Sequence, residues 1–157
     1  MNLYSIMIVD DEENVLKSLQ RTFRGKKNWQ VETYANAQDA LKRARCHIFD
    51  IVITDYMMPH VNGVEFLKEV CELQPDAIRI LLTGSVNIDT LLQAVNEANA
   101  FRFIPKPWDD ARLIRTMEEA IGYRDIKLEN KGLLRKLERF EEMYGPLEED
   151  RRAPPLS

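Results

Sequence analysis

Five short apolar runs, separated by amphipathic stretches, constrain the fold of this 157-residue chain most strongly. The runs cover residues 3–9, 30–34, 48–54, 78–83 and 101–104. Several of them are nearly continuous in Ile, Val, Leu and Met, which is typical of parallel strands that helices bury on both faces. We therefore expect an α/β fold built on a five-stranded parallel sheet.

The stretches between the runs carry apolar residues at helical spacing. The expected helices begin near Val15, Asn36, Val64 and Ile88 and after Asp110. Strands that alternate with helices in this way specify a doubly wound sheet with helices on both faces. Functional groups in such folds lie at the carboxyl ends of the strands.

Composition narrows the functional classes. The chain carries 22 basic and 26 acidic residues, a net charge of −4, without the basic excess of a nucleic-acid-binding protein. It contains no apolar run near the roughly 20 residues that a membrane-spanning helix needs. We expect a cytoplasmic protein that contacts neither nucleic acid nor membrane directly.

The C-terminal region has a different periodicity. Between residues 123 and 144 the seam positions alternate in steps of three and four, as in a coiled coil. The seam consists of Tyr123, Ile126, Asn130, Leu133, Leu137, Phe140 and Tyr144. Asn130 falls at an a position, where a buried Asn fixes the register of a dimer. A homodimer through this helix and a solvated single helix are both open interpretations.

These patterns divide the chain into three segments. Residues 1–122 form the α/β domain, and residues 123–144 form a helical or coiled-coil extension. Residues 145–157 are rich in proline and charge, which indicates a disordered tail or a linker.

Polar residues stand where four of the predicted strands end. Asp10 and Asp11 follow the first strand, Asp55 follows the third, Thr83 ends the fourth and Lys106 comes just after the fifth. Because the carboxyl ends of parallel strands meet at one edge of the sheet, we expect these five side chains to gather there.

Carboxylates gathered in this way need a counter-charge. Two of them near 4 Å repel each other by about 4 kcal/mol at an effective dielectric constant of 20. A cluster of oxygen atoms without soft ligands suits Mg²⁺, which binds a few carboxylates and keeps several waters. We expect Mg²⁺ to be the cofactor.

Four segments resemble the signature segments of response-regulator receiver domains, the chemotaxis-regulator-like family. They are Val9–Glu12, Thr54–Pro59, Leu82–Gly84 and Ile104–Pro107. The resemblance covers roughly residues 3–122 and keeps the order and spacing of the family. It implies a flavodoxin-like sheet with strand order 2-1-3-4-5, followed here by an extended C-terminal helix.

The resemblance also implies how the acidic residues act. Asp55 would accept a phosphoryl group from a histidine kinase or a phosphotransfer protein. Asp11 and Asp55 would bind Mg²⁺ directly, Asp10 would act through water, and the backbone carbonyl of Met57 would complete the protein ligands. Glu12 is expected to lie at the start of the first helix rather than in the ligand set.

The remaining site residues follow from the same resemblance. Lys106 and the Thr83 hydroxyl would contact the oxygens of the phosphoryl group, and the Lys106–Pro107 bond would be cis. Thr83 and Phe103 would form the switch, with Phe103 at the position where the family more often has Tyr. Without a hydroxyl, coupling through Phe103 must run through packing of its ring.

Residues 101–109 resemble receivers that precede cyclic-di-GMP phosphodiesterase domains of the HD-GYP family, or that occur in hybrid sensory kinases. These residues contain no HD-GYP motif and no kinase motif. The sequence therefore leaves the output domain or partner unidentified, and it leaves open whether the chain is part of a longer protein.

Other functions and plainer structural roles are open to these residues, but the sequence favours them less. A phosphatase with an aspartyl nucleophile carries a second Asp two residues later, where this chain has Met57. A pseudo-receiver that binds partners without phosphorylation normally lacks one of the key residues. Structurally, Asp10 and Asp11 could only cap a helix, Lys106 could be solvated, and Asp50 is expected to be structural. We interpret the chain as a self-phosphorylating switch and not as a metabolic enzyme.

Overall fold

The computed structural model describes residues 2–84 and 87–146. Within these residues, five strands alternate with five helices along the chain. The strands are β1 (Tyr4–Val9), β2 (Trp29–Tyr34), β3 (Ile51–Asp55), β4 (Ile78–Thr83) and β5 (Arg102–Pro105). The helices are α1 (Glu13–Phe23), α2 (Ala37–Ala44), α3 (Gly63–Leu73), α4 (Ile88–Ala98) and α5 (Asp110–Tyr144).

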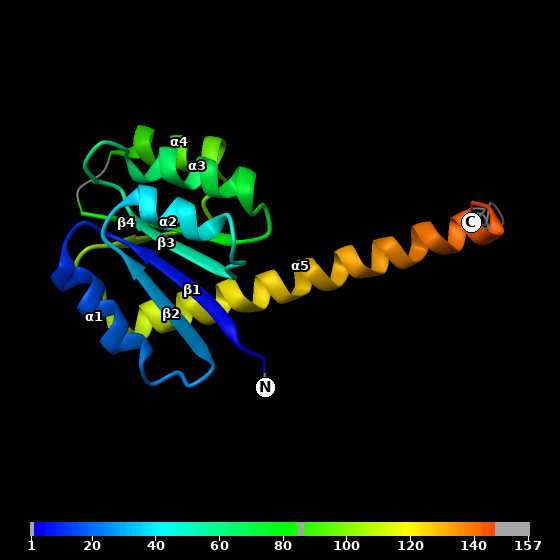
Figure 1. Ribbon diagram of the computed structural model, residues 1–157, viewed down its shortest axis with the longest axis horizontal. Coiled ribbons are helices and arrows are strands. Elements are labelled where there is room, and N and C mark those ends of the chain that lie inside the picture. Colours follow the sequence, from blue (N-terminus) through cyan, green and yellow to red (C-terminus); the bar gives the residue numbers. More distant parts are fainter. Residues whose placement is uncertain (1, 85–86, 147–157) are drawn as a thin grey trace, which may run out of the picture. The chain divides into compact units, whose positions relative to one another are not determined.

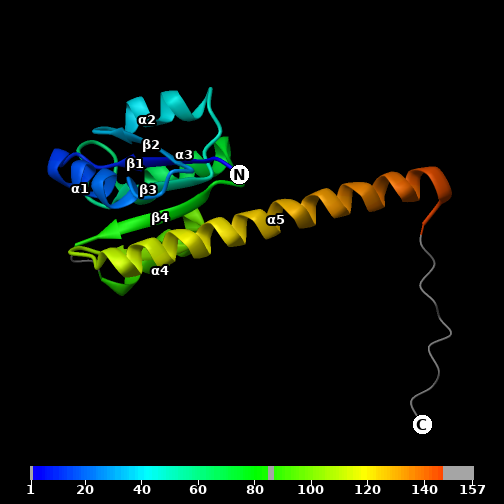
Figure 2. The same ribbon diagram turned by 90° about the horizontal axis from the view of Figure 1, so that it is seen from below.

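The strands form one parallel sheet in the order β2-β1-β3-β4-β5. Figure 1 and Figure 2 show helices on both faces of this sheet. The predicted α/β class, strand order and extended C-terminal helix are therefore confirmed.

Two apolar clusters, one on each face of the sheet, explain why the strand sequences are nearly continuous apolar runs. In β1, Ile6 and Ile8 join the cluster that includes α1 and the first turns of α5. Their neighbours Met7 and Val9 join the cluster with α2, α3 and α4. Since successive side chains of a strand point to opposite faces, a strand covered on both sides must be apolar throughout.

The third strand begins later than the sequence predicted. The apolar run starts at Ile48, but β3 starts at Ile51 and the Ile48 side chain is 73% exposed. The Phe49 amide donates to the side-chain Oε1 of Gln74 at 2.8 Å, not to a neighbouring strand. Apolar composition alone did not distinguish this loop anchor from the strand that follows it.

Asparagine side chains fix where three helices begin. Asn36, Asn62 and Asn87 each accept a hydrogen bond from the amide three residues later, which caps α2, α3 and α4. These caps satisfy amides that the first helical turn leaves without partners. They end the loops that follow β2, β3 and β4, so the caps of α3 and α4 help to define the carboxyl edge of the sheet.

The chain divides into two compact units, Met1–Arg124 and Asp125–Ser157. In the first unit, the start of α5 buries Leu113, Met117, Ala120 and Ile121 against the sheet. In the second unit, the helix exposes a set of large apolar side chains. They are Ile126, Leu133, Leu134, Leu137, Phe140, Met143 and Tyr144.

The segment predicted to be a tail or linker, residues 145–157, lies outside the described residues from 147 onwards. None of the helices in the described ranges combines the length and the apolar character that crossing a bilayer requires.

Candidate functional site

The chain leaves β1 through Asp10 and Asp11. Asp10 is fully buried, and its Oδ1 accepts a hydrogen bond from the Glu12 amide at 2.8 Å, which turns the chain into α1. Asp11 is exposed on the same turn. Glu12 stands at the start of α1, as expected, although its side chain caps none of the described amides.

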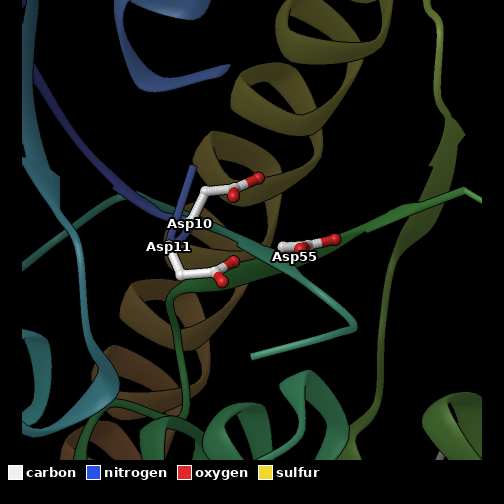
Figure 3. Close-up of side chains that lie close together, drawn as sticks. All are labelled: Asp10, Asp11 and Asp55. Carbon is white, nitrogen blue, oxygen red and sulfur yellow. The ribbon is translucent and has the colours of Figure 1, made fainter. Parts of the chain in front are cut away.

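The third carboxylate comes from the end of β3. Asp55 is its last residue and is 5% exposed. Asp10, Asp11 and Asp55 each offer an oxygen atom, and these atoms all lie within 4.8 Å of one another. Figure 3 shows the three side chains side by side at this edge of the sheet. The structure thus brings together the three acidic residues that the sequence placed at strand ends.

Lys106 reaches the same place from the end of β5. Its Nζ lies 2.9 Å from Asp10 Oδ2 and 3.1 Å from Asp55 Oδ1. The Lys106 amide donates to the carbonyl of Thr83 at 2.7 Å, which extends the pairing of β5 with β4. The peptide bond between Lys106 and Pro107 is cis, as predicted.

The electrostatics of the cluster show that it lacks positive charge. Burial raises the pKa of the Asp55 carboxyl, the Asp10 carboxylate raises it further, and the opposing effect of Lys106 is smaller. For Lys106, burial alone would lower the pKa. Its hydrogen bonds and charge interactions with Asp10 and Asp55 outweigh burial and raise the pKa of the ammonium group. Of the three clustered carboxylates, Asp10 and Asp55 contact the one ammonium group, so added positive charge would offset the remaining repulsion.

The other predicted site residues surround this cluster at different depths. Thr83 ends β4 and is 7% exposed. Phe103 is half-buried in β5 and packs, as Tyr56 and Met58 do, against the apolar cluster on the face of the sheet that α2, α3 and α4 cover. The Met57 side chain is 71% exposed. The candidate Mg²⁺ ligand at this residue is its backbone carbonyl, two residues after Asp55.

Sequence reasoning missed two residues that contact the backbone of Asp55. The Thr54 hydroxyl donates to the Asp55 carbonyl oxygen at 3.1 Å, and Gly63 packs against the same carbonyl group. A glycine in the first turn of an amphipathic helix is a signal of close backbone approach that the sequence did contain.

The donor set fits a hard divalent cation. Within the described ranges, the three carboxylates form a cluster of oxygen ligands that includes no histidine or cysteine. Such a set suits Mg²⁺, whereas zinc and copper prefer nitrogen and sulfur ligands. The burial of Asp10 and Asp55 and the raised pKa of Asp55 both indicate that added positive charge stabilises the site.

Comparison with known proteins gives a family. The sequence profile described as "Response regulator receiver domain" matches residues 6–118. The hydrogenase transcriptional regulatory protein HoxA of Bradyrhizobium diazoefficiens is 36% identical over 74% of this chain and 24% of its own length. The C4-dicarboxylate transport transcriptional regulatory protein DctD of Rhizobium meliloti is 31% identical over 85% of this chain and 29% of its own. The chain thus spans 24% and 29% of the length of these two relatives.

Solved structures agree with the fold. The signal receiver domain of an HD domain-containing protein from Pseudomonas fluorescens Pf-5 has a TM-score of 0.75 and 27% identity, over 79% of this chain and 98% of that one. A CheY-like receiver domain protein from Methanospirillum hungatei JF-1 has a TM-score of 0.76 and 25% identity, over 80% of this chain and 99% of that one.

Proposed function

The chain belongs to the response regulator receiver domain family, and from that premise we propose that it is a phosphorylation switch with Asp55 as the acceptor. One observation carries the proposal. The carboxylates of Asp10, Asp11 and Asp55 lie together at the carboxyl edge of the sheet, and the ammonium group of Lys106 contacts two of them, Asp10 and Asp55. A nucleophile, oxygen ligands for a cation and a fixed positive charge are what phosphoryl transfer requires.

In the proposed reaction, a carboxylate oxygen of Asp55 attacks the phosphorus of a phosphohistidine on a histidine kinase or a phosphotransfer protein. The new O–P bond forms as the P–N bond breaks, and the imidazole leaves with the bonding pair. Asp55 is nearly buried and is the last residue of β3, so the donor would approach it from the carboxyl edge of the sheet. Burial and the Asp10 carboxylate raise the pKa of Asp55, so a cation nearby would favour its charged form.

Mg²⁺ is the proposed cofactor. Asp11 and Asp55 would hold it directly, Asp10 through water, and the Met57 carbonyl would complete the protein ligands. The described contacts support an indirect role for Asp10, because its two oxygens already accept from the Glu12 amide and Lys106. When bound, the ion supplies positive charge that offsets the carboxylates and the phosphoryl oxygens.

Lys106 and Thr83 act on the transferred group in this proposal. The Lys106 ammonium group, held 3.1 Å from Asp55 Oδ1, offers a positive charge to the phosphoryl oxygens. The Thr83 hydroxyl donates a hydrogen bond to one of them. Movement of Thr83 toward the phosphoryl group would change the packing of Phe103, which is half-buried on the adjacent strand, and so alter the surface.

The proposal covers the chain segment by segment. Residues 1–122 form the receiver, and residues 123–144 form a helical extension that pairs in a parallel homodimer. Residues 145–157 serve as a tail or linker. The protein acts in the cytoplasm as a self-phosphorylating switch, not as a metabolic enzyme, on an output domain or partner that the chain does not identify.

Incubation with acetyl phosphate and Mg²⁺, followed by intact mass measurement, tests the function. We expect one phosphoryl adduct, stable in acid and labile in base. The adduct should be absent in Asp55→Asn and present in Asp89→Asn, a matched variant at an exposed site in α4. An adduct that persists in Asp55→Asn contradicts the assignment of the acceptor.

Two further outcomes favour the alternatives. Absence of an adduct with acetyl phosphate and with a phosphorylated histidine kinase favours the pseudo-receiver, a module that binds partners without phosphorylation. Continuous turnover of generic phosphate esters favours a phosphatase.

A further inference from the structure

Tyr56, the residue that follows Asp55, makes backbone hydrogen bonds through both its amide and its carbonyl. The Tyr56 amide donates to the Leu82 carbonyl at 3.0 Å, which continues the β3–β4 pairing by one residue. The Tyr56 carbonyl accepts from the Gly63 amide at 2.8 Å, which closes the loop between β3 and α3. The residues on either side of Tyr56 are Asp55, which carries the acceptor carboxylate, and Met57, which carries the candidate carbonyl ligand.

The carbonyl group of Asp55 itself has two further contacts. The Thr54 hydroxyl donates to its oxygen at 3.1 Å. The backbone of Gly63, the first residue of α3, packs directly against it. A Cβ atom at position 63 would overlap the Asp55 carbonyl oxygen and lie 3.0 Å from both the carbonyl carbon and Leu81 Cδ1.

The need for glycine at position 63 is one of space. Backbone conformation does not require glycine here, because Gly63 is not among the described residues with positive φ. The atoms that a Cβ would meet are backbone atoms and the side chain of a fully buried Leu, which have no room to move away. A larger residue must therefore displace either the first turn of α3 or the end of β3.

We propose that Gly63 is a positioning residue for Asp55: it lets α3 pack on the Asp55 carbonyl and so fixes the direction of the acceptor carboxylate and of the Met57 carbonyl. This inference rests on the proposed function of Asp55. Groups that react with a phosphoryl donor tolerate little displacement, since an error of about 1 Å can cost about a hundredfold in rate.

The test compares Gly63→Ala with Gly122→Ala in the full chain. Gly122 lies in α5, and in the described part of the chain a Cβ there meets no heavy atom within 4 Å. Mg²⁺ affinity is measured by titration with the metal alone, and adduct formation from acetyl phosphate is followed across donor and Mg²⁺ concentrations. Urea unfolding and circular dichroism report whether each variant is folded.

We expect folded Gly63→Ala to bind Mg²⁺ at least several-fold more weakly and to react at least tenfold more slowly at saturating donor. Gly122→Ala should match the wild type in both properties and should be slightly more stable. A folded Gly63→Ala chain with wild-type Mg²⁺ affinity and wild-type maximal rate overturns the proposal.

A second pair of variants decides the case in which Gly63→Ala does not fold. Thr54→Val removes the hydroxyl, which contacts the same carbonyl group and also Met58 Sδ at 3.6 Å, at nearly constant volume, and Thr54→Ser keeps it. We expect a loss of Mg²⁺ affinity and maximal rate in Thr54→Val that Thr54→Ser rescues. Equal values for the two variants and the wild type contradict the inference.

Failure of the proposed function gives a different result. If the wild-type chain forms no adduct with any donor, Asp55 is not an acceptor, whatever the variants do. If the wild-type chain reacts and the Gly63 and Thr54 variants react equally well, only the positioning role is wrong.

Discussion

Arg124 and Asp50 form an ion pair at the end of β3 opposite Asp55. Arg124 Nη1 lies 2.5 Å from Asp50 Oδ1, and the two side chains are only 11% and 16% exposed. The other carboxylate oxygen of Asp50 accepts a hydrogen bond from the Ser5 amide at 2.7 Å. One carboxylate therefore joins the starts of β1 and β3 to the last residue of α5 that belongs to the first compact unit.

Removing either partner of this ion pair should destabilise the chain. Asp50→Asn leaves the Arg124 charge buried without its carboxylate, and such losses typically cost about 3 kcal/mol. Urea unfolding should show this decrease, whereas Lys17→Met, which breaks an exposed pair with Glu13, should change stability by less than about 0.5 kcal/mol. Similar small effects of both substitutions would mean that the pair contributes little to the fold.

The pH dependence of stability should reveal the cost of charging Asp55. Because burial and Asp10 raise its pKa in the folded chain, folding favours the protonated carboxyl, and stability falls as the pH rises from the ordinary value of 3.8 through the raised one. In Mg²⁺-free buffer, Asp55→Asn should therefore become increasingly more stable than the wild type across this window and keep that advantage at neutral pH.

Glu32 supplies a control with the opposite sign. The hydrogen bond from Arg43 lowers the pKa of Glu32, so its stabilising effect is present above the ordinary value of 4.5 and lost as the pH falls through the lowered one. Glu32→Gln should be less stable than the wild type at neutral pH, and this difference should disappear in acid. Urea unfolding at several pH values measures both differences, and a parallel pH dependence for the two variants contradicts the assignment.

The strand-end rule predicted much of the site from sequence. Asp10, Asp11, Asp55 and Lys106 were located by their positions after apolar runs, because parallel strands end at a common edge. The rule describes the backbone and not the pairing of side chains. It did not predict that Lys106 Nζ lies 2.9 Å from Asp10 Oδ2, a contact that depends on the direction of the long Lys106 side chain.

Other features depend on packing that periodicity does not record. Arg124 falls in a stretch that reads as a charged, solvated helix, yet it is buried by its pairing with Asp50. Gly63 was overlooked because its function is to leave space for the Asp55 carbonyl. Ile48 was assigned to a strand because an apolar residue in a loop and one in a strand look alike in sequence. In the structure its side chain is exposed.

Removing the charge of Lys106 should strengthen Mg²⁺ binding. The ammonium group contacts Asp10 and Asp55 and therefore repels a second cation in the same cluster. Lys106→Met should raise Mg²⁺ affinity at least tenfold, or about 1.4 kcal/mol, because charges a few ångströms apart interact by several kcal/mol. Isothermal titration calorimetry measures the affinity, with Lys68→Met, from an exposed pair with Glu97, as the control. Unchanged or weaker binding in Lys106→Met contradicts this electrostatic description.

His60 should be replaceable by glycine with a gain in stability. It has φ of 72°, and the Val61 amide donates to the Pro59 carbonyl at 2.9 Å, which makes His60 the centre of a tight γ-turn. A side chain in the left-handed region costs about 1 kcal/mol, so His60→Gly should raise the free energy of unfolding by about 0.5 kcal/mol once the entropy of glycine is included. Asn99→Gly, at φ of 50°, should gain less because Asn tolerates this region. Urea unfolding of both variants checks the order.

The heptad seam of residues 123–144 should hold two chains together. Leu137 at an a position and Phe140 at a d position are 40% and 46% exposed in the single chain, so pairing would remove apolar surface from water. Sedimentation should give twice the 18.3 kDa mass of one chain for the wild type, and Leu137→Glu should be monomeric while Arg135→Glu, at an f position, stays dimeric. In a parallel pair, Lys136 at g faces Glu141 at e of the partner, so Lys136→Glu and Glu141→Lys should each weaken the dimer and together restore it. A monomeric wild-type chain at micromolar concentration, or a Leu137→Glu chain that still dimerises, contradicts pairing through this helix.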